Sequence, residues 1–257
     1  DYLVIDSFDD ERYVLIANQD GQVKRVLLSD FNKTRINKTF NVLESSLVNP
    51  LVSIDLQESF DSYVVLVSHQ GYVVKYDIEE IPVQSLMAKG VKGINLRKDQ
   101  LIGAKFATKI NKDELLLLTN RGGLKREFTM NIETSHRPAK GKRYFKLVKT
   151  NPYFVVSIAC ENIFRLKSYI NVHLISKKKD VSIPGDALKP DKYENGIPLL
   201  EKEDHPEMIR IDIDRYQEAI NILLKIQDQS TEDEVDDNDD LINELEKIIS
   251  ISQEDEA

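Results

Sequence analysis

The chain has 257 residues, of which 41% are hydrophobic and 31% charged, and its net charge is −9. It can form a core, but its longest apolar runs, such as residues 115–118, are far shorter than the roughly 20 residues of a membrane-spanning helix. The single cysteine, Cys160, excludes an internal disulfide and favours a reducing compartment. We therefore expect a cytoplasmic protein without a membrane segment, and because the chain begins at Asp1 rather than Met, a piece of a longer protein.

The net charge hides an asymmetry along the chain. Residues 1–160 hold 23 basic and 19 acidic side chains, residues 161–214 hold 9 and 11, and residues 215–257 hold 3 and 14. Within the first block, residues 89–149 carry 16 basic and 5 acidic side chains, a net charge of +11. The sequence thus combines a basic body with an acidic tail, so the overall charge does not exclude a polyanionic partner.

A hairpin pattern recurs three times in the basic body. Residues 13–25, 63–75 and 115–126 each contain an apolar run, a short polar turn that ends in glycine, and a second run. The turn glycines Gly21, Gly71 and Gly122 are 50 and 51 residues apart. The pattern predicts β-hairpins, in which glycine supplies the positive φ of the turn and the apolar run is a strand buried on both faces.

A second shared element follows two of these hairpins. Residues 88–96 match residues 139–147 at the same lag of 51 residues, while the first unit keeps only Arg35 and Lys38 of this element. A fourth, degenerate hairpin is predicted at residues 172–176, with Lys179 in the place of the turn glycine. Two motifs that keep one lag indicate a repeat architecture.

Units of about 50 residues with roughly four strands each predict an all-β fold, in which the blades of a propeller-like array pack against their neighbours. We expect an incomplete array of about four blades over residues 1–214, with repeats at 1–56, 57–107, 108–160 and 161–214. From Asp214 the periodicity becomes helical, and six of the nine residues 231–239 are acidic. Residues 215–257 are therefore predicted to form an acidic tail with two short amphipathic helices.

The recurring basic residues predict a surface for a polyanion. Lysine or arginine follows each turn glycine by three or four residues, and the shared loops add more, so the repeat should place them along one basic rim. Because no base-reading helix is evident, contacts should be made to the DNA backbone. The candidate DNA-binding residues are Lys24, Arg25, Lys75, Lys89, Lys92, Arg97, Lys98, Arg121, Lys125, Arg126, Arg137, Lys140, Lys142, Arg143 and Lys146.

Enzyme chemistry is poorly represented in the sequence. The four histidines are far apart and lack metal-ligand spacing, and Cys160 lies in an apolar strand. A phosphate-binding glycine loop and a zinc-protease motif are both missing from the sequence. We therefore expect no catalytic residue, metal or cofactor site in this chain.

The shared loops resemble a known family. The hairpin glycine followed by Lys-Arg, the Ala-Lys-Gly-Val-Lys-Gly-Ile-Asn-Leu of residues 88–96 and the Thr-Ser-His-Arg-Pro-Ala-Lys-Gly of residues 134–141 resemble the C-terminal domain of bacterial type IIA topoisomerase A subunits. The Lys-Thr-Asn-Pro of residues 149–152 is similar to a motif of the topoisomerase IV branch. The resemblance covers residues 1–160 well, 161–214 poorly and the tail not at all.

This resemblance implies a β-pinwheel whose basic rim binds and bends duplex DNA beside a cleavage core. It implies an ATP-dependent A2B2 holoenzyme that acts on the chromosome, whose catalytic tyrosine, ATP site, Mg²⁺ and contacts to the topoisomerase IV B subunit lie outside this chain. Arg143 and Tyr144 form the dipeptide that carries the catalytic tyrosine in the family, but they lie in a basic loop, so Tyr144 is expected to pack or to face DNA.

Two alternatives remain open from the sequence. The first is a DNA gyrase domain, but its Gln-Arg-Arg-Gly-Gly-x-Gly box is not matched, since the similar residues 120–123 fall in a predicted hairpin turn. The second is a propeller-like scaffold whose basic rim meets an acidic protein. The acidic tail either competes with DNA for the rim or only aids solubility.

Overall fold

The computed structural model describes residues 3, 5, 7, 8, 11–33, 42, 43, 50–57, 59–110, 113–162, 169–188 and 195–214. In these ranges every regular element is a β-strand or a short 3-10 helix, which confirms the predicted all-β class. No helix in the same ranges has the length and apolar character needed to cross a membrane. The predicted acidic tail, 215–257, and its two helices lie outside the described residues, as do Arg35 and Lys38 of the first unit.

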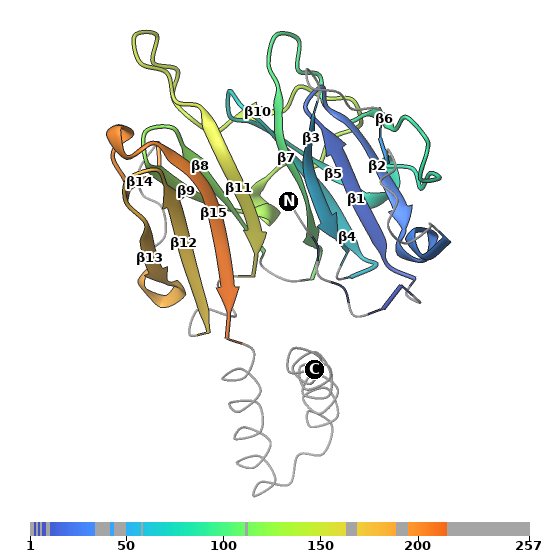
Figure 1. Ribbon diagram of the computed structural model, residues 1–257. Coiled ribbons are helices and arrows are strands. Elements are labelled where there is room, and N and C mark those ends of the chain that lie inside the picture. Colours follow the sequence, from blue (N-terminus) through green and yellow to red (C-terminus); the bar gives the residue numbers. More distant parts are fainter. Residues whose placement is uncertain are drawn as a thin grey trace, which may run out of the picture.

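The described strands form four antiparallel sheets, which stand side by side as the blades of an open array (Figure 1). Blade 1 has the strand order β3 (Leu51–Leu56), β1 (Tyr13–Asn18), β2 (Gln22–Leu27) and β6 (Val91–Lys92). Blade 2 has the order β7 (Leu101–Thr108), β4 (Ser62–Ser68), β5 (Tyr72–Asp77) and β10 (Lys142–Arg143). Blade 3 has the order β11 (Val155–Glu161), β8 (Glu114–Thr119), β9 (Gly123–Phe128) and β14 (Ile197–Pro198). Blade 4 has the order β15 (Pro206–Ile213), β12 (Ile170–Ser176) and β13 (Val181–Pro184).

Short 3-10 helices connect the strands of the blades. They are η1 (Leu28–Lys33), η2 (Ile78–Glu80), η3 (Thr129–Asn131), η4 (Gly185–Ala187) and η5 (Lys202–Asp204). The first four each directly follow the second strand of a hairpin, so they occupy equivalent places in the four repeats.

The hydrophobic cores lie between neighbouring blades. Leu15 and Val23 of blade 1 pack with Leu66 and Tyr76 of blade 2, and similar layers join blade 2 to blade 3 and blade 3 to blade 4. The hairpin strands are thus covered on both faces, as the continuous apolar runs predict; residues 115–118 of β8 are fully buried. Three of the four core clusters found among the described residues thus join neighbouring blades, while the fourth is formed almost entirely by residues of blade 1.

The hairpin turns have the predicted geometry. Gly71 has a φ of 79°, and its N–H donates to the carbonyl oxygen of Ser68 at 2.9 Å. The Ser68 hydroxyl in turn accepts from the N–H of Tyr72 at 3.1 Å. Gly21 and Gly122 repeat this φ and this backbone hydrogen bond, so the three glycines close equivalent turns.

Neighbouring blades exchange short strands, which the sequence repeats do not predict. The two-residue strands β6, β10 and β14 each belong by sequence to the next repeat, yet they pair with the hairpin of the preceding blade. They lie in segments 88–98, 137–147 and 195–200, which we call the latch loops. Each latch loop therefore fastens one blade to the next.

All three latch loops make the same contacts. A glycine of positive φ precedes each short strand, and at one of them, Gly141, a Cβ atom would lie 2.3 Å from the carbonyl oxygen of Val73. Only glycine permits this approach. Farther along, a loop N–H donates to the carbonyl oxygen of the turn glycine, and a buried apolar residue such as Phe145 covers that glycine. The three hydrogen bonds are Gly93 to Gly21 at 2.8 Å, Tyr144 to Gly71 at 3.0 Å and Leu199 to Gly122 at 3.0 Å.

The fourth blade contains a hairpin at the position of the degenerate repeat. Its hairpin pairs β12 with β13, and Lys179 lies in the turn, where its N–H donates to the Ser176 hydroxyl at 3.0 Å. The third latch loop, whose glycine is Gly196, was not predicted from the sequence, because this glycine follows Gly141 by 55 residues rather than 51.

Candidate nucleic-acid interface

Three of the predicted DNA-binding residues are buried. The exposed fraction is 0% for Lys24, 5% for Arg25 and 4% for Lys75, so these side chains cannot reach a ligand at the surface. The Lys24 ammonium donates to the carbonyl oxygens of Ser85, Leu86 and Ala88 at 2.6 to 3.0 Å, and burial lowers its pKa to about 8. The prediction that Lys24, Arg25 and Lys75 form a basic edge at the surface is wrong.

These buried residues and the half-buried Arg126 hold neighbouring blades together instead. Arg25, Lys75 and Arg126 each follow their turn glycine by four residues and donate to a backbone carbonyl in, or directly after, the 3-10 helix of the next blade. The acceptors are Ile81 for Arg25 at 2.6 Å, Thr129 for Lys75 at 3.0 Å and Leu188 for Arg126. Arg126 also pairs with the fully buried carboxylate of Glu114. Because blades pack on both faces of the hairpin, a basic residue at this position bridges two blades.

The basic residues of the first two latch loops have a different environment. Residues 88–98 and 137–146 contain nine lysines and arginines and no acidic residue. Seven of the nine are exposed: Lys89, Lys92, Arg97, Lys98, Lys140, Lys142 and Lys146. The predicted basic surface therefore exists on the latch loops, but not on the hairpin strands.

The two loops form one continuous surface. The N–H of Asn95 donates to the carbonyl oxygen of Ala139 at 2.8 Å, next to a bridge between Ile94 and Ala139. Arg137 links them further, since its Nη1 donates to the carbonyl oxygen of Lys92 at 3.0 Å and its Nε to that of Glu80 at 2.8 Å. Arg137 is thus occupied in joining the loops.

The remaining predicted residues are half-buried. Arg121 lies over the Tyr153 ring, 4.3 Å from its centroid, and Arg143 lies 5.9 Å from the centroid of Tyr72. Lys125 is half-buried on β9 of blade 3. These three residues can contribute to the potential of the surface, but their side chains are less accessible than those of the latch loops.

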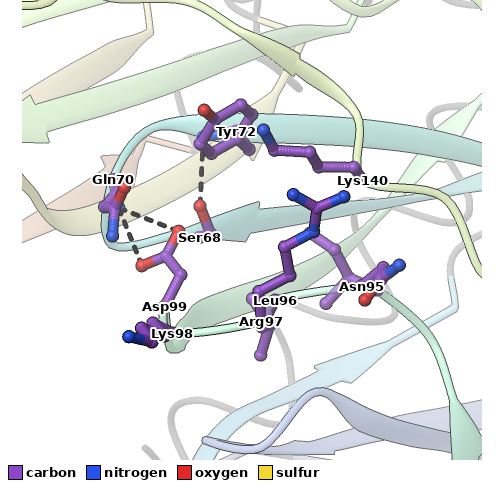
Figure 2. A pocket seen from close by; sticks show the side chains of 10 residues that line it. Ser68, Gln70, Tyr72, Asn95, Leu96, Arg97, Lys98, Asp99 and Lys140 are labelled. Atoms are coloured by element: carbon purple, nitrogen blue, oxygen red, sulfur yellow. Dashed lines mark hydrogen bonds between the residues drawn. The ribbon is translucent and has the colours of Figure 1, made fainter.

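A hollow of about 320 Å³ opens between the two latch loops and the β4–β5 turn (Figure 2). Its lining comes from three segments that are distant in sequence: Ser68, Gln70, Tyr72, Ile94, Asn95, Leu96, Arg97, Lys98, Asp99 and Lys140. Figure 2 shows Arg97 and Lys140 extending toward Tyr72 from different loops. Tyr72 and Asn95 were not predicted from the sequence. The sequence signal that could have identified Tyr72 is a tyrosine directly after the turn glycine, which occurs in one repeat only.

Tyr144 and Cys160, two nucleophilic side chains of the described region, are not activated. Burial raises the pKa of Tyr144 to about 12 and that of the Cys160 thiol well above its ordinary value. Tyr144 is partly buried and packs against the core between blades 2 and 3, which is the first of its two expected roles. Within the described ranges, no group of three or more His, Cys, Asp or Glu side chains is arranged to hold a metal ion.

Comparison with known proteins finds relatives that match part of this chain. The profile of the family described as "DNA gyrase C-terminal domain, beta-propeller" matches residues 12–37 and 62–105. The A subunit of DNA topoisomerase 4 from Streptococcus pneumoniae is 33% identical over 155 residues, which are 59% of this chain and 18% of that protein. The Bacillus subtilis protein of the same name is 26% identical over 201 residues, which are 78% and 24% of the two chains. The chain is therefore similar in sequence to the C-terminal domains of gyrase and topoisomerase IV A subunits.

Solved structures share the fold of this chain. The C-terminal domain of DNA topoisomerase IV superposes with a TM-score of 0.71 at 22% identity, covering 82% of this chain and 65% of the other. The DNA gyrase A C-terminal domain gives 0.64 at 18% identity, covering 80% and 66%. At these identities the likeness establishes the β-propeller-like fold alone. The chain spans about a fifth to a quarter of the length of its curated relatives.

Proposed function

We propose that this domain binds and bends duplex DNA as the C-terminal module of a topoisomerase IV A subunit. The observation that carries the proposal is the pair of joined latch loops, with nine basic side chains and no acidic one. Lysine and arginine on such a surface neutralise phosphates and release counterions without reading base sequence. The buried basic residues of the hairpins contribute the stiffness that bending requires, since they join neighbouring blades.

The whole protein is proposed to be a type IIA topoisomerase that passes one duplex through another in an ATP-dependent reaction. The domain would present duplex DNA to that strand-passage core for decatenation, relaxation and chromosome segregation in the cytoplasm. The catalytic tyrosine, ATP, Mg²⁺ and the topoisomerase IV B subunit would belong to parts outside this chain, within an A2B2 assembly. Tyr144 is not proposed as the nucleophile, because its raised pKa disfavours the phenolate.

The gyrase alternative is less well supported. Residues 120–123 resemble part of the gyrase box, but they form the β8–β9 turn, where Gly122 closes the turn with a φ of 77°. The third latch loop covers that glycine, since Leu199 and Leu200 both donate their N–H groups to its carbonyl oxygen. Latch-loop N–H groups also donate to Gly21 and Gly71, so a structural role accounts for this sequence.

Duplex binding is tested by fluorescence anisotropy of the 257-residue chain over a range of salt concentrations. If about six phosphates are neutralised, log Kd should change with log salt with a slope of about 5. The variant Lys89→Gln/Lys92→Gln/Lys142→Gln should bind more weakly and with a smaller slope. The matched control Lys177→Gln/Lys178→Gln/Lys202→Gln removes three exposed lysines of blade 4 and should behave as wild type. Absence of binding at low salt would refute the proposal.

A scaffold for an acidic protein is the second candidate, because the same basic loops would attract carboxylates. Binding of an acidic protein without measurable binding of duplex DNA would favour it. DNA binding that the latch-loop variant weakens would favour the topoisomerase module.

A further inference from the structure

Two basic residues of the latch loops converge on the hollow of Figure 2. Arg97 reaches it from the first latch loop and Lys140 from the second, and both side chains are exposed. The Lys140 ammonium lies 4.4 Å from the centroid of the Tyr72 ring, which fixes its place without neutralising it. In the described part of the chain, the Arg97 guanidinium has no ion-pair partner. These two cations, together with Lys98 of the first latch loop, therefore line one space from separate elements.

The backbone at Arg97 is held in an uncommon conformation. Its φ is 57°, in the left-handed region, which is unfavourable for a non-glycine residue. Nearby, the Asp99 carboxylate fixes the loop by accepting from the N–H of Gln70 at 3.1 Å and of Gln100 at 2.8 Å. Strain of this kind persists where the surroundings impose it, and it gathers at ligand sites. Asp99, the carboxylate in the lining, is thus engaged with backbone donors.

The hollow is not repeated at the next blade junction. By the repeat register, Gly123, Val148 and Asn195 take the places of Tyr72, Arg97 and Lys140. The Asn195 side chain is used there within the protein, because its Oδ1 accepts from the N–H of Lys146 at 2.9 Å. If the fold itself required these cationic residues, they would recur at both junctions. Two blade junctions can be compared over described residues, and these cationic residues occur only at the junction of blades 2 and 3.

We propose that this hollow holds one backbone phosphate of duplex DNA and acts as a fixed anchor, rather than as one part of a uniform basic rim. The inference rests on the proposed DNA-binding function and makes it specific. The Arg97 guanidinium and the Lys140 ammonium donate to the phosphate oxygens from two sides, and Asn95 borders the same space. Because the loops are joined through Ala139, the two donors are already positioned before DNA arrives.

The anchor is tested by comparing two charge-matched pairs in the full chain. Arg97→Gln/Lys140→Gln removes the pair in the hollow, and Lys89→Gln/Lys142→Gln removes two exposed lysines of the same loops outside it. A fixed anchor predicts that the first pair loses about tenfold more duplex affinity than the second. A third variant, Arg97→Asn, tolerates the left-handed backbone and removes only the guanidinium, so weaker binding there cannot be ascribed to strain.

The outcomes separate the anchor from the proposed function. Equal losses for the two pairs, with DNA binding by the wild type intact, would overturn the anchor and leave the function standing. Absence of duplex binding by the wild type would overturn both. Inorganic phosphate is the second probe. Weak competition by phosphate with the duplex would support the anchor on DNA. A phosphate affinity equal to that of the duplex would assign the hollow to a free phosphate ion.

Discussion

The latch glycine Gly141 provides a test of how the fold builds the interface. Substitution by alanine places a Cβ atom 2.3 Å from the carbonyl oxygen of Val73 and 2.5 Å from Cγ1 of Val74, at a φ of 79°. The left-handed conformation alone costs roughly 1–2 kcal/mol, and the overlap should push β10 away from β5. Each hydrogen bond that the latch then loses, including that from Tyr144 to Gly71, is worth about 1 kcal/mol.

Together these terms predict that Gly141→Ala lowers the free energy of unfolding by about 3 to 4 kcal/mol. At roughly 2–4 °C per kcal/mol, the melting temperature should fall by about 10 °C in calorimetry. Duplex affinity measured well below the transition should also fall, although no charge is removed, because Lys140 and Lys142 are carried on the displaced latch. Thr150→Ala, an exposed substitution close by, is the control. A loss below about 1 kcal/mol with unchanged DNA affinity would refute the latch role of this loop.

Three further predictions concern the buried and paired charges. Glu114→Gln should destabilise the chain by about 3 kcal/mol in urea denaturation, because it leaves the Arg126 guanidinium without its buried partner; an unchanged midpoint would contradict this role. Lys75→Met should lower stability by about 1 to 3 kcal/mol but leave the DNA affinity of the folded chain unchanged; weaker binding would return Lys75 to the interface. The hydrogen bond from Lys109 lowers the pKa of Asp77, so the stability that ionised Asp77 contributes is present above the ordinary carboxyl pKa and is lost as pH falls through the lowered value. The melting temperature of Asp77→Asn should therefore decline less steeply toward acid pH than that of the wild type. An equal slope would refute the linkage.

The hairpins could be predicted from the sequence because their determinants are local. A buried run, a polar turn and a glycine of positive φ specify a hairpin within about a dozen residues, and Gly21, Gly71 and Gly122 recur at nearly constant spacing. The exchange of β6, β10 and β14 could not be predicted in this way. Each is only two residues long, and its partner lies on the hairpin of the preceding repeat, about 70 residues earlier in the chain.

The candidate site was only partly predictable for a related reason. The recurrence of a basic residue four positions after the turn glycine was interpreted as a repeated surface, yet a repeated inter-blade contact produces the same recurrence. Arg25 and Lys75 lie on strands that have four consecutive buried residues, so both faces are covered. In the latch loops the basic residues flank glycines, and the strands there are only two residues long. Lys89, Lys92 and Lys142 are therefore left exposed.

The most direct test of the latch-loop interface is acetylation of lysines in the full chain, read by mass spectrometry with and without duplex DNA. We predict that DNA protects the exposed latch-loop lysines, while Lys177, Lys178 and Lys202 of blade 4 stay equally reactive. Lys24 and Lys75 should react poorly in both conditions, because their ammonium groups are buried and donate to backbone carbonyls. Protection of the blade 4 lysines without protection of the latch loops, or ready acetylation of Lys24 and Lys75 in the folded chain, would contradict this interface.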